Sequence, residues 1–236
     1  FRQVEKLNYR SSNVVAVQSP ANLDVFKHIY SGQVDLKVLM NWSAQTPYAE
    51  KEDFDVCLLR RELNMPLDRV VIFYGGNIGH AQDMANIVRL TRRLRSNEKV
   101  HFFLVGQGDE YEMVQKAIEE YQLGNLTLIP SVSQEKYREY LACADIGLFS
   151  LAKEHSAHNF PGKLLGYMVE GKPILGSVNF GNDVATIISD SKSGFVSFNG
   201  DDDQFFNDTV SLIENKALRK EMGLNAYALL GNTFSV

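Results

Sequence analysis

Short apolar segments alternate with helical patterns along most of this chain, and this alternation restricts the fold more than any other feature. Segments rich in β-branched and aromatic residues lie at 13–19, 70–76, 100–106, 126–132, 146–151, 172–177 and 194–198. Stretches with apolar residues at helical spacing, such as 81–95 and 109–123, separate most of them. Strands this apolar have to be covered on both faces, as they are in parallel sheets. The sequence therefore predicts an α/β fold with a doubly wound, mainly parallel sheet.

The regular alternation does not begin at the first residue. Residues 41–68 are polar and rich in turn formers, and they lie between a strand-like piece at 35–40 and the regular pattern that starts at Arg69. We interpret residues 1–42 as the end of a preceding domain, 43–68 as a linker and 69–236 as one α/β domain. Because the chain starts with Phe1 rather than methionine, we expect it to be a piece of a longer protein.

Composition excludes several classes of protein. The chain has 24 lysines and arginines against 29 acidic residues, a net charge of −5, which gives no reason to expect nucleic acid as a partner. Cys57 and Cys143 are distant from each other and form no CxxC pair, so a disulfide framework or a zinc knuckle is not expected. No apolar run is long enough to cross a membrane. A cytoplasmic location is the resulting expectation.

Ligands of open α/β sheets bind where strands lead into helices, at the carboxyl ends of the strands. The first loop of this kind carries Gly75, Gly76 and Gly79, which permit close approach of the backbone to a ligand. It matches neither GxGxxG nor the Walker sequence, and a glycine-rich turn without a ligand is the alternative. The second loop carries Gly106 and Gly108, followed by Asp109 and Glu110. Since these acids repel phosphate, we expect helix capping or contacts with sugar hydroxyls there.

The third loop leads into a helix with Lys163 in its first turn, after Pro161 and Gly162. A cation at this end of a helix is unfavourable unless an anion binds nearby, so the loop indicates a phosphate site. The alternative is that Lys163 simply extends into solvent.

His158 precedes that helix, and Lys153 and His155 lie on the same approach. The Glu154-His155-x-x-His158 spacing does not match the zinc-binding helix patterns, so we expect no metal ion. A hydrogen bond from His158 to an anionic or hydroxylated ligand is one use of this side chain, and a surface histidine without a role is the alternative.

Taken in order, the motifs resemble a known family. The loops "GGNIG" and "VGQGDE", the Ala144-Asp145 step and above all "KLLGYMVEGKPIL" at 163–175 are similar to the donor-binding, carboxyl-terminal half of glycosyltransferase family 4. That family has the GT-B architecture of two Rossmann-like domains. The resemblance covers most of residues 69–235 and makes 69–236 the nucleotide-sugar domain. Among subfamilies, the chain looks most like transferases of acetamido sugars, fucosamine-type included, in bacterial surface polysaccharide assembly.

The resemblance implies a retaining, metal-independent transfer from a UDP-sugar, with an N-acetylated amino sugar as the expected group. It implies a lipid-linked saccharide acceptor held by the missing amino-terminal domain, and a full-length protein peripheral on the inner face of the cytoplasmic membrane. The isolated chain would then bind donor and transfer poorly or not at all, and no cofactor is expected.

The same resemblance implies roles for individual residues. Lys163 and His158 would be catalytic. The donor diphosphate would contact Gly75, Gly76, Asn77, Gly79, Gly162 and Lys163. The base, ribose and sugar would contact Gly106, Gly108, Pro130, Ser131, Val132, Asn182 and Asp183. For Pro130 to Val132 a turn at a strand end is the alternative, and for Asn182 and Asp183 an Asx helix cap.

One departure from the family pattern concerns its two glutamates, which are separated by seven residues. The matching positions here are His158 and Gly166, so ribose recognition has no assigned residue. Two further readings therefore stay open, a noncatalytic nucleotide-sugar binding module and a sugar-nucleotide 2-epimerase. A nicotinamide dehydrogenase is disfavoured because no acidic residue follows a proper GxGxxG at the expected distance.

Overall fold

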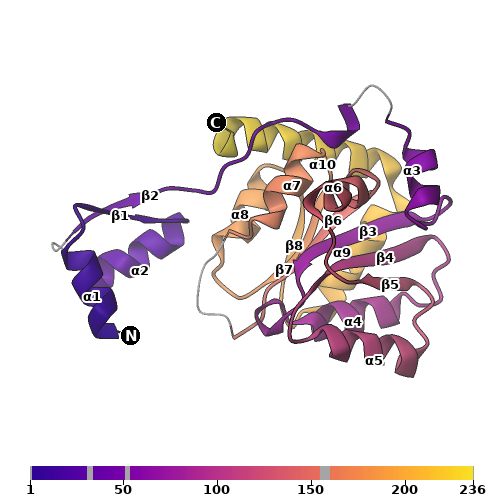
Figure 1. The fold of residues 1–236 in the computed structure, drawn as a ribbon, viewed down its shortest axis with the longest axis horizontal. Helices are drawn as coiled ribbons and strands as arrows, with labels where there is room; N and C mark the ends of the chain where they lie inside the picture. The colour runs from indigo at the N-terminus through magenta and orange to yellow at the C-terminus, as the bar shows by residue number, and fades with distance from the viewer. Residues whose placement is uncertain (1, 31–33, 51–53, 155–159, 236) are drawn as a thin grey trace.

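A six-stranded parallel sheet forms the centre of the molecule, and the computed structural model describes residues 2–30, 34–50, 54–154 and 160–235. The strands are β3 (Val70–Asn77), β4 (Val100–Gln107), β5 (Leu126–Ile129), β6 (Ile146–Ser150), β7 (Ile174–Val178) and β8 (Gly194–Phe198). They lie in the order β5-β4-β3-β6-β7-β8, and all neighbouring pairs are parallel (Figure 1). This is the doubly wound α/β fold that the alternating pattern predicts.

Helices cover both faces of this sheet, because each strand presents apolar side chains on both sides. Within β3, Ile72 and Tyr74 join one apolar cluster, and Val71 and Phe73 join the other. The first cluster lies under α4 (Met84–Arg93), α5 (Tyr111–Tyr121) and α9 (Asp202–Glu214). The second lies under α6 (Gln134–Ala142), α7 (Lys163–Val169) and α8 (Asp183–Asp190). The remaining helix, α10 (Lys216–Leu229), contributes to both and continues into η3 (Leu230–Phe234).

Short polar side chains start several of these helices. Asp83 accepts a hydrogen bond from the backbone N–H of Asn86 at the start of α4, and Ser133 accepts one from Lys136 at the start of α6. Such caps satisfy N–H groups that have no partner within a helix. They fix where each helix begins relative to the strand end before it, and this positions the loops that could bind a ligand.

The first forty residues form a small separate unit. It contains α1 (Arg2–Arg10), β1 (Val14–Val17), α2 (Pro20–Tyr30) and β2 (Asp35–Val38). β1 and β2 pair with each other in parallel and do not join the six-stranded sheet. Figure 1 shows this unit beside the main body, joined to it by an extended stretch of chain. That it is the end of an acceptor domain stays a prediction.

The segment expected to be a turn-rich linker is more ordered than its composition suggests. It contains η1 (Tyr48–Glu50) and the helix α3 (Val56–Glu62), which Asp55 caps through the N–H groups of Cys57 and Leu58. Arg60 of α3 is buried and bonds to groups of the main domain, the carbonyl of Cys143 among them. The tertiary contact explains the difference, since polar composition alone does not reveal that one arginine is anchored inside the protein.

The strand order reverses between β3 and β6. The chain passes from β3 outward to β4 and β5, and from β6 outward to β7 and β8 on the other side. The connections that follow β3 and β6 therefore lead to opposite sides at the carboxyl edge of the sheet, which is where open α/β sheets bind their ligands.

Candidate functional site

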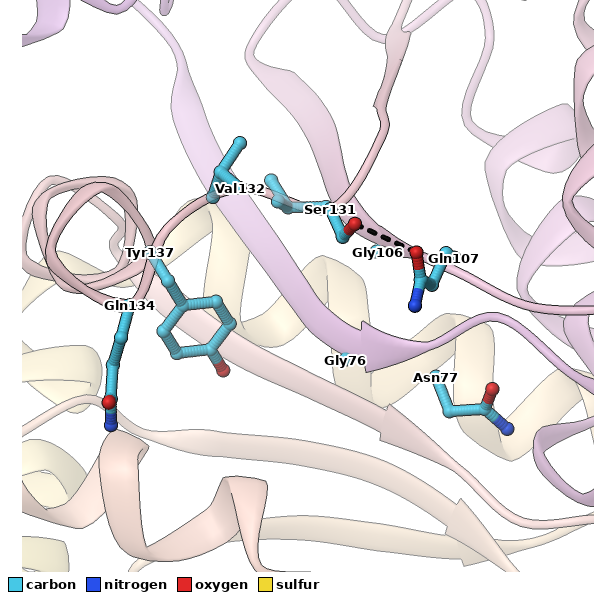
Figure 2. A pocket seen from close by; sticks show the side chains of 9 residues that line it. Gly76, Asn77, Gly106, Gln107, Ser131, Val132, Gln134 and Tyr137 are labelled. Carbon is cyan, nitrogen blue, oxygen red and sulfur yellow. Dashed lines mark hydrogen bonds between the residues drawn. The ribbon is translucent and has the colours of Figure 1, made fainter.

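A pocket of about 400 Å³ opens at the carboxyl ends of β3, β4 and β5 (Figure 2). It is lined by Gly76, Asn77, Val105, Gly106, Gln107, Ser131, Val132, Gln134 and Tyr137. The hydroxyl of Ser131 donates a hydrogen bond of 2.9 Å to Oε1 of Gln107, which ties the end of β5 to the end of β4. Among the residues expected from sequence, this pocket brings together Gly76, Asn77, Gly106, Ser131 and Val132.

Glycines at the strand ends let the backbone approach this pocket closely. Gly76 has φ +123°, a conformation that favours glycine. A Cβ at Gly106 would lie 1.8 Å from the carbonyl oxygen of Gly76. Gly75 makes room for a side chain instead, because a Cβ there would lie 2.3 Å from Cε2 of Tyr137. Of the three, Gly76 and Gly106 line the pocket, and Gly75 leaves the space that the Tyr137 ring occupies.

Lys163 reaches from α7 to the carboxyl end of β3. Its Nζ is buried, has no hydrogen-bond partner among the residues that the structure describes, and lies 3.6 Å from the centroid of the Tyr74 ring. The same atom is 3.6 Å from the position that a Cβ at Gly76 would take. Burial lowers the pKa of Lys163 to about 7. Lys172, which follows α7, also has a lowered pKa because of burial, but its Nζ donates to the carbonyl of Ala142. Lys163 therefore differs in lacking an acceptor.

The helix that carries Lys163 begins at Lys163 itself. Gly162 is the cap of α7, and Pro161 lies before the cap. The N–H groups of Leu164 and Leu165 already donate to the carbonyls of Pro161 and Gly162. The helix therefore offers an anion its lysine rather than these two N–H groups.

The unfolding free energy should depend on pH through Lys163. Below about pH 7 the group is charged in both the folded and the unfolded chain, so the cost of burying the charge is present in full. Between about pH 7 and its ordinary value of 10.5, the unfolded chain still holds a proton that the folded chain has released, so stability rises with pH. We expect a Lys163→Met variant to be more stable than the unaltered chain at pH 6.5, by a margin that shrinks toward pH 10. Urea unfolding of both proteins at several pH values measures this margin. A margin independent of pH would contradict the buried charge.

The acidic pair after β4 holds the neighbouring loop in place. Asp109 accepts a hydrogen bond of 3.2 Å from the N–H of His80, and Glu110 accepts one of 2.9 Å from the N–H of Met84, the first residue of α4. These side chains therefore cap backbone N–H groups as expected. The groups belong to α4 and to the loop before it, and not to the helix that follows β4. A Cβ at Gly79 would lie 2.6 Å from Oδ1 of Asp109, so an acidic group occupies the space beside it. We therefore leave Gly79 out of the candidate diphosphate contacts.

Other residues expected at the site serve the architecture. Gly108 faces backbone, since a Cβ there would lie 2.2 Å from the carbonyl oxygen of Ile78. Asn182 is buried as the cap of α8 and donates to Asn179, so its side chain is engaged. Asp183 accepts the N–H of Ala21 and thereby joins α8 to α2. For Asn182 the structure thus has the helix cap that was the alternative reading.

Two expected residues do not line this pocket, and a third is outside the part of the chain that the structure describes. Pro130 is not among the residues that line the pocket. Gly162 lines a second, adjoining pocket of about 530 Å³, together with Gly166. His158, like His155, lies outside the described residues.

Sequence reasoning missed Tyr137, Gln134 and Gln107, which also line the first pocket. Tyr137 lies in the first turn of α6, directly after the loop that leaves β5. Its spacing with Tyr140 and Leu141 resembles an ordinary core stripe, so the only signal was its place near the carboxyl edge of the sheet.

Within the described ranges, no group of three or more histidine, cysteine, aspartate or glutamate side chains is placed to hold a metal ion. A search of the same residues finds no helix with the length and hydropathy needed to span a bilayer.

Comparison with known proteins decides the family. The model of the family described as glycosyl transferases group 1 matches residues 57–229, which is most of the chain. The chain belongs to the glycosyl transferases group 1 family. The match begins within α3 and includes every strand of the main sheet, so the pocket and Lys163 both lie in the part that defines the membership.

Two curated relatives of this glycosyl transferase chain are similar in sequence. WcaI of Escherichia coli (strain K12), named as a colanic acid biosynthesis glycosyl transferase, is 30% identical over 131 residues, which is 56% of this chain and 32% of WcaI. WbjE of Pseudomonas aeruginosa, named as a glycosyltransferase, is 29% identical over 167 residues, which is 68% of this chain and 39% of WbjE. The matched regions thus amount to about a third of WcaI and about two fifths of WbjE.

Solved structures agree on the fold. Anabaena HepE, solved with UDP and glucose, superposes with a TM-score of 0.84 at 17% identity, covering 99% of this chain and 62% of HepE. At this identity the superposition shows a shared architecture, and it confirms the expected GT-B type of domain.

Proposed function

We propose that this chain is the donor-binding part of a glycosyltransferase and holds a nucleoside diphosphate sugar at the carboxyl edge of the sheet, in the pocket at the ends of β3, β4 and β5. The observation that carries the proposal is the buried Nζ of Lys163, which has no acceptor among the described residues and lies next to Gly76. A diphosphate oxygen at this place would give the ammonium group an anionic partner. HepE, which shares the fold, was solved in complex with UDP and glucose, and this supports uridine as the base.

The proposed chemistry needs positive charge at this point. When a glycosyl group leaves its donor, the bond between the anomeric carbon and the diphosphate oxygen breaks, and the diphosphate keeps the electron pair. A cation fixed in advance stabilises the charge that develops on the leaving group. Lys163 would supply that charge, so the proposal requires no metal ion. Retention of the anomeric configuration is part of the proposal and follows the resemblance to family 4.

The transferred sugar and the acceptor are proposed from the name of one relative and from the resemblance to family 4. The name of WcaI refers to colanic acid biosynthesis, which supports a saccharide acceptor in polysaccharide assembly. A lipid-linked acceptor and an N-acetylated amino sugar as the transferred group follow the resemblance stated above. Because the curated relatives are much longer than the matched regions, we propose that other parts of the protein hold the acceptor at the inner face of the cytoplasmic membrane. The chain alone should then bind donor without efficient transfer.

Calorimetric titration of the 236-residue chain with UDP, GDP and ADP tests this function. We expect saturable binding, tightest for UDP, that is the same in magnesium and after addition of a chelator. If GDP or ADP bound most tightly, the proposed diphosphate site would stand, and the proposed base would change from uracil to guanine or adenine. Binding that disappears with the chelator would contradict the role given to Lys163. The absence of binding by all three nucleotides would contradict the donor site.

A further inference from the structure

Tyr137 separates the two adjoining pockets at the carboxyl edge of the sheet. Together with Gln134, it lines both the pocket of Figure 2 and the second pocket, which Gly162 and Gly166 also line. Figure 2 shows its ring projecting from α6 into the first pocket, with the hydroxyl directed toward the end of β3. The hydroxyl has no hydrogen bond to any residue that the structure describes, and it would lie 2.7 Å from a Cβ at Gly75.

The Tyr137 ring is held firmly. It packs edge-on against Phe73, with ring centroids 5.6 Å apart and an interplanar angle of 68°. The absence of a side chain at Gly75 leaves the space that the ring and hydroxyl occupy. Gln134, the other residue shared by the two pockets, is exposed. A hydroxyl that is already fixed loses little conformational freedom when a ligand binds, so Tyr137 is the better placed of the two for specific recognition.

We propose that the Tyr137 hydroxyl binds the ribose of the nucleotide and makes the site select ribonucleotides over deoxyribonucleotides. The inference rests on the proposed function and adds to it a residue that sets specificity. Lys163 and Gly76 mark the phosphate end of the site, and Ser131 and Val132 mark the opposite end of the pocket. Tyr137 lines the same pocket from α6, so a ribose that joins base and diphosphate there can come within reach of its hydroxyl.

The chemistry of the hydroxyl suits this role. Burial raises the pKa of Tyr137 to about 12, so the group stays protonated and can both donate and accept a hydrogen bond. A ribose hydroxyl can do the same. Gly166, which also lines the second pocket, has no side chain to offer, and a Cβ there would lie 3.1 Å from Cδ2 of Leu141. The tyrosine thus supplies a polar group where α7 presents none at position 166.

The test compares ribonucleotides with nucleotides that lack one ribose hydroxyl. UDP, GDP and ADP, and their 2′-deoxy and 3′-deoxy counterparts, are titrated calorimetrically into the unaltered chain, Tyr137→Phe and Tyr140→Phe. Tyr140 is the matched control because it lies on the same helix, packs on Phe103 and does not line either pocket. For the nucleotide that binds tightest, we expect the unaltered chain to prefer the ribo form about tenfold over at least one deoxy form. Tyr137→Phe should abolish this preference, and Tyr140→Phe should keep it.

Two results would overturn the assignment while leaving the donor site intact. The preference could persist unchanged in Tyr137→Phe, or the substitution could weaken the ribo and deoxy forms equally, which would place the hydroxyl on a phosphate or the base. If none of the three nucleotides binds the unaltered chain, the proposed function fails, and the ribose assignment fails with it. Because phenylalanine keeps the ring on Phe73, equal urea unfolding curves will show that a lost preference comes from the hydroxyl.

Discussion

Replacing Lys163 by methionine should weaken nucleotide binding about 100-fold and, at the same time, make the unliganded chain more stable. The loss of affinity is expected because a charge-assisted contact to the diphosphate disappears from a buried site. The gain in stability, about 1–4 kcal/mol near neutral pH, is expected because an ammonium group without an acceptor among the described residues is replaced by an apolar side chain of similar length. Methionine also keeps a favourable contact with the Tyr74 ring.

The opposite signs of these two effects distinguish a binding residue from a structural one. Calorimetric titration with UDP gives the first quantity, and urea unfolding at pH 7 gives the second. Lys216 provides the control, because it is likewise the first residue of its helix but is exposed. Lys216→Met should leave both quantities nearly unchanged. A Lys163→Met variant that is less stable than the unaltered chain would show that Lys163 has a stabilising partner, and our account of the site would be wrong.

Replacing Arg60 by methionine should lower the free energy of unfolding by about 3–5 kcal/mol. The guanidinium of Arg60 donates to the carbonyl of Cys143 through Nε at 2.9 Å and through Nη2 at 2.7 Å, and Nη2 also lies 2.7 Å from Oδ2 of Asp145. The same carboxylate oxygen accepts the N–H of Val71 at the start of β3. Removal of the Arg60 guanidinium leaves the part-buried Asp145 carboxylate without its cation and the Cys143 carbonyl without its donor.

Urea unfolding measures this loss, and Arg61→Met is the matched control. Arg61 is the next residue of the same helix and is exposed, so its replacement should change stability by no more than about 0.5 kcal/mol. Equal unfolding curves for the two variants would mean that α3 is not anchored through Arg60.

The sheet could be predicted from the sequence because strands that are buried on both faces consist almost entirely of apolar residues. Phe102, Phe103 and Leu104 of β4 are fully buried, and so apolar a run has few other uses in a soluble domain. The helix α3 was not predicted, because what holds it is one arginine bonded to groups some eighty residues later in the chain. The spacing of apolar residues gives no information on contacts between residues so far apart in the chain.

The candidate site was predictable where it depends on backbone and not where it depends on side-chain direction. Glycines at strand ends identified the loops, and the lysine in an unfavourable helix position identified Lys163. Asp109 and Asn182 show the limit of this reasoning. Each has a polar side chain beside a glycine loop, and each turned out to bond to nearby backbone N–H groups. Tyr137 shows the opposite case, since its core-like spacing concealed a side chain that reaches a pocket.

The fastening of the linker restricts how the two units of this protein can move. Ser43 donates its N–H to Phe234, Gln45 donates to the carbonyl of Tyr227, and Arg60 is bonded inside the main domain. Most of the segment from 43 onward is therefore fixed to the main domain and moves together with it. A swing of the amino-terminal unit would have to turn about the few residues between β2 and Ser43. It would also have to break two bonds to the main domain, one from the N–H of Ala21 to Asp183 and one from Nδ2 of Asn41 to the carbonyl of Phe160. These two bonds therefore hold the amino-terminal unit against the main domain.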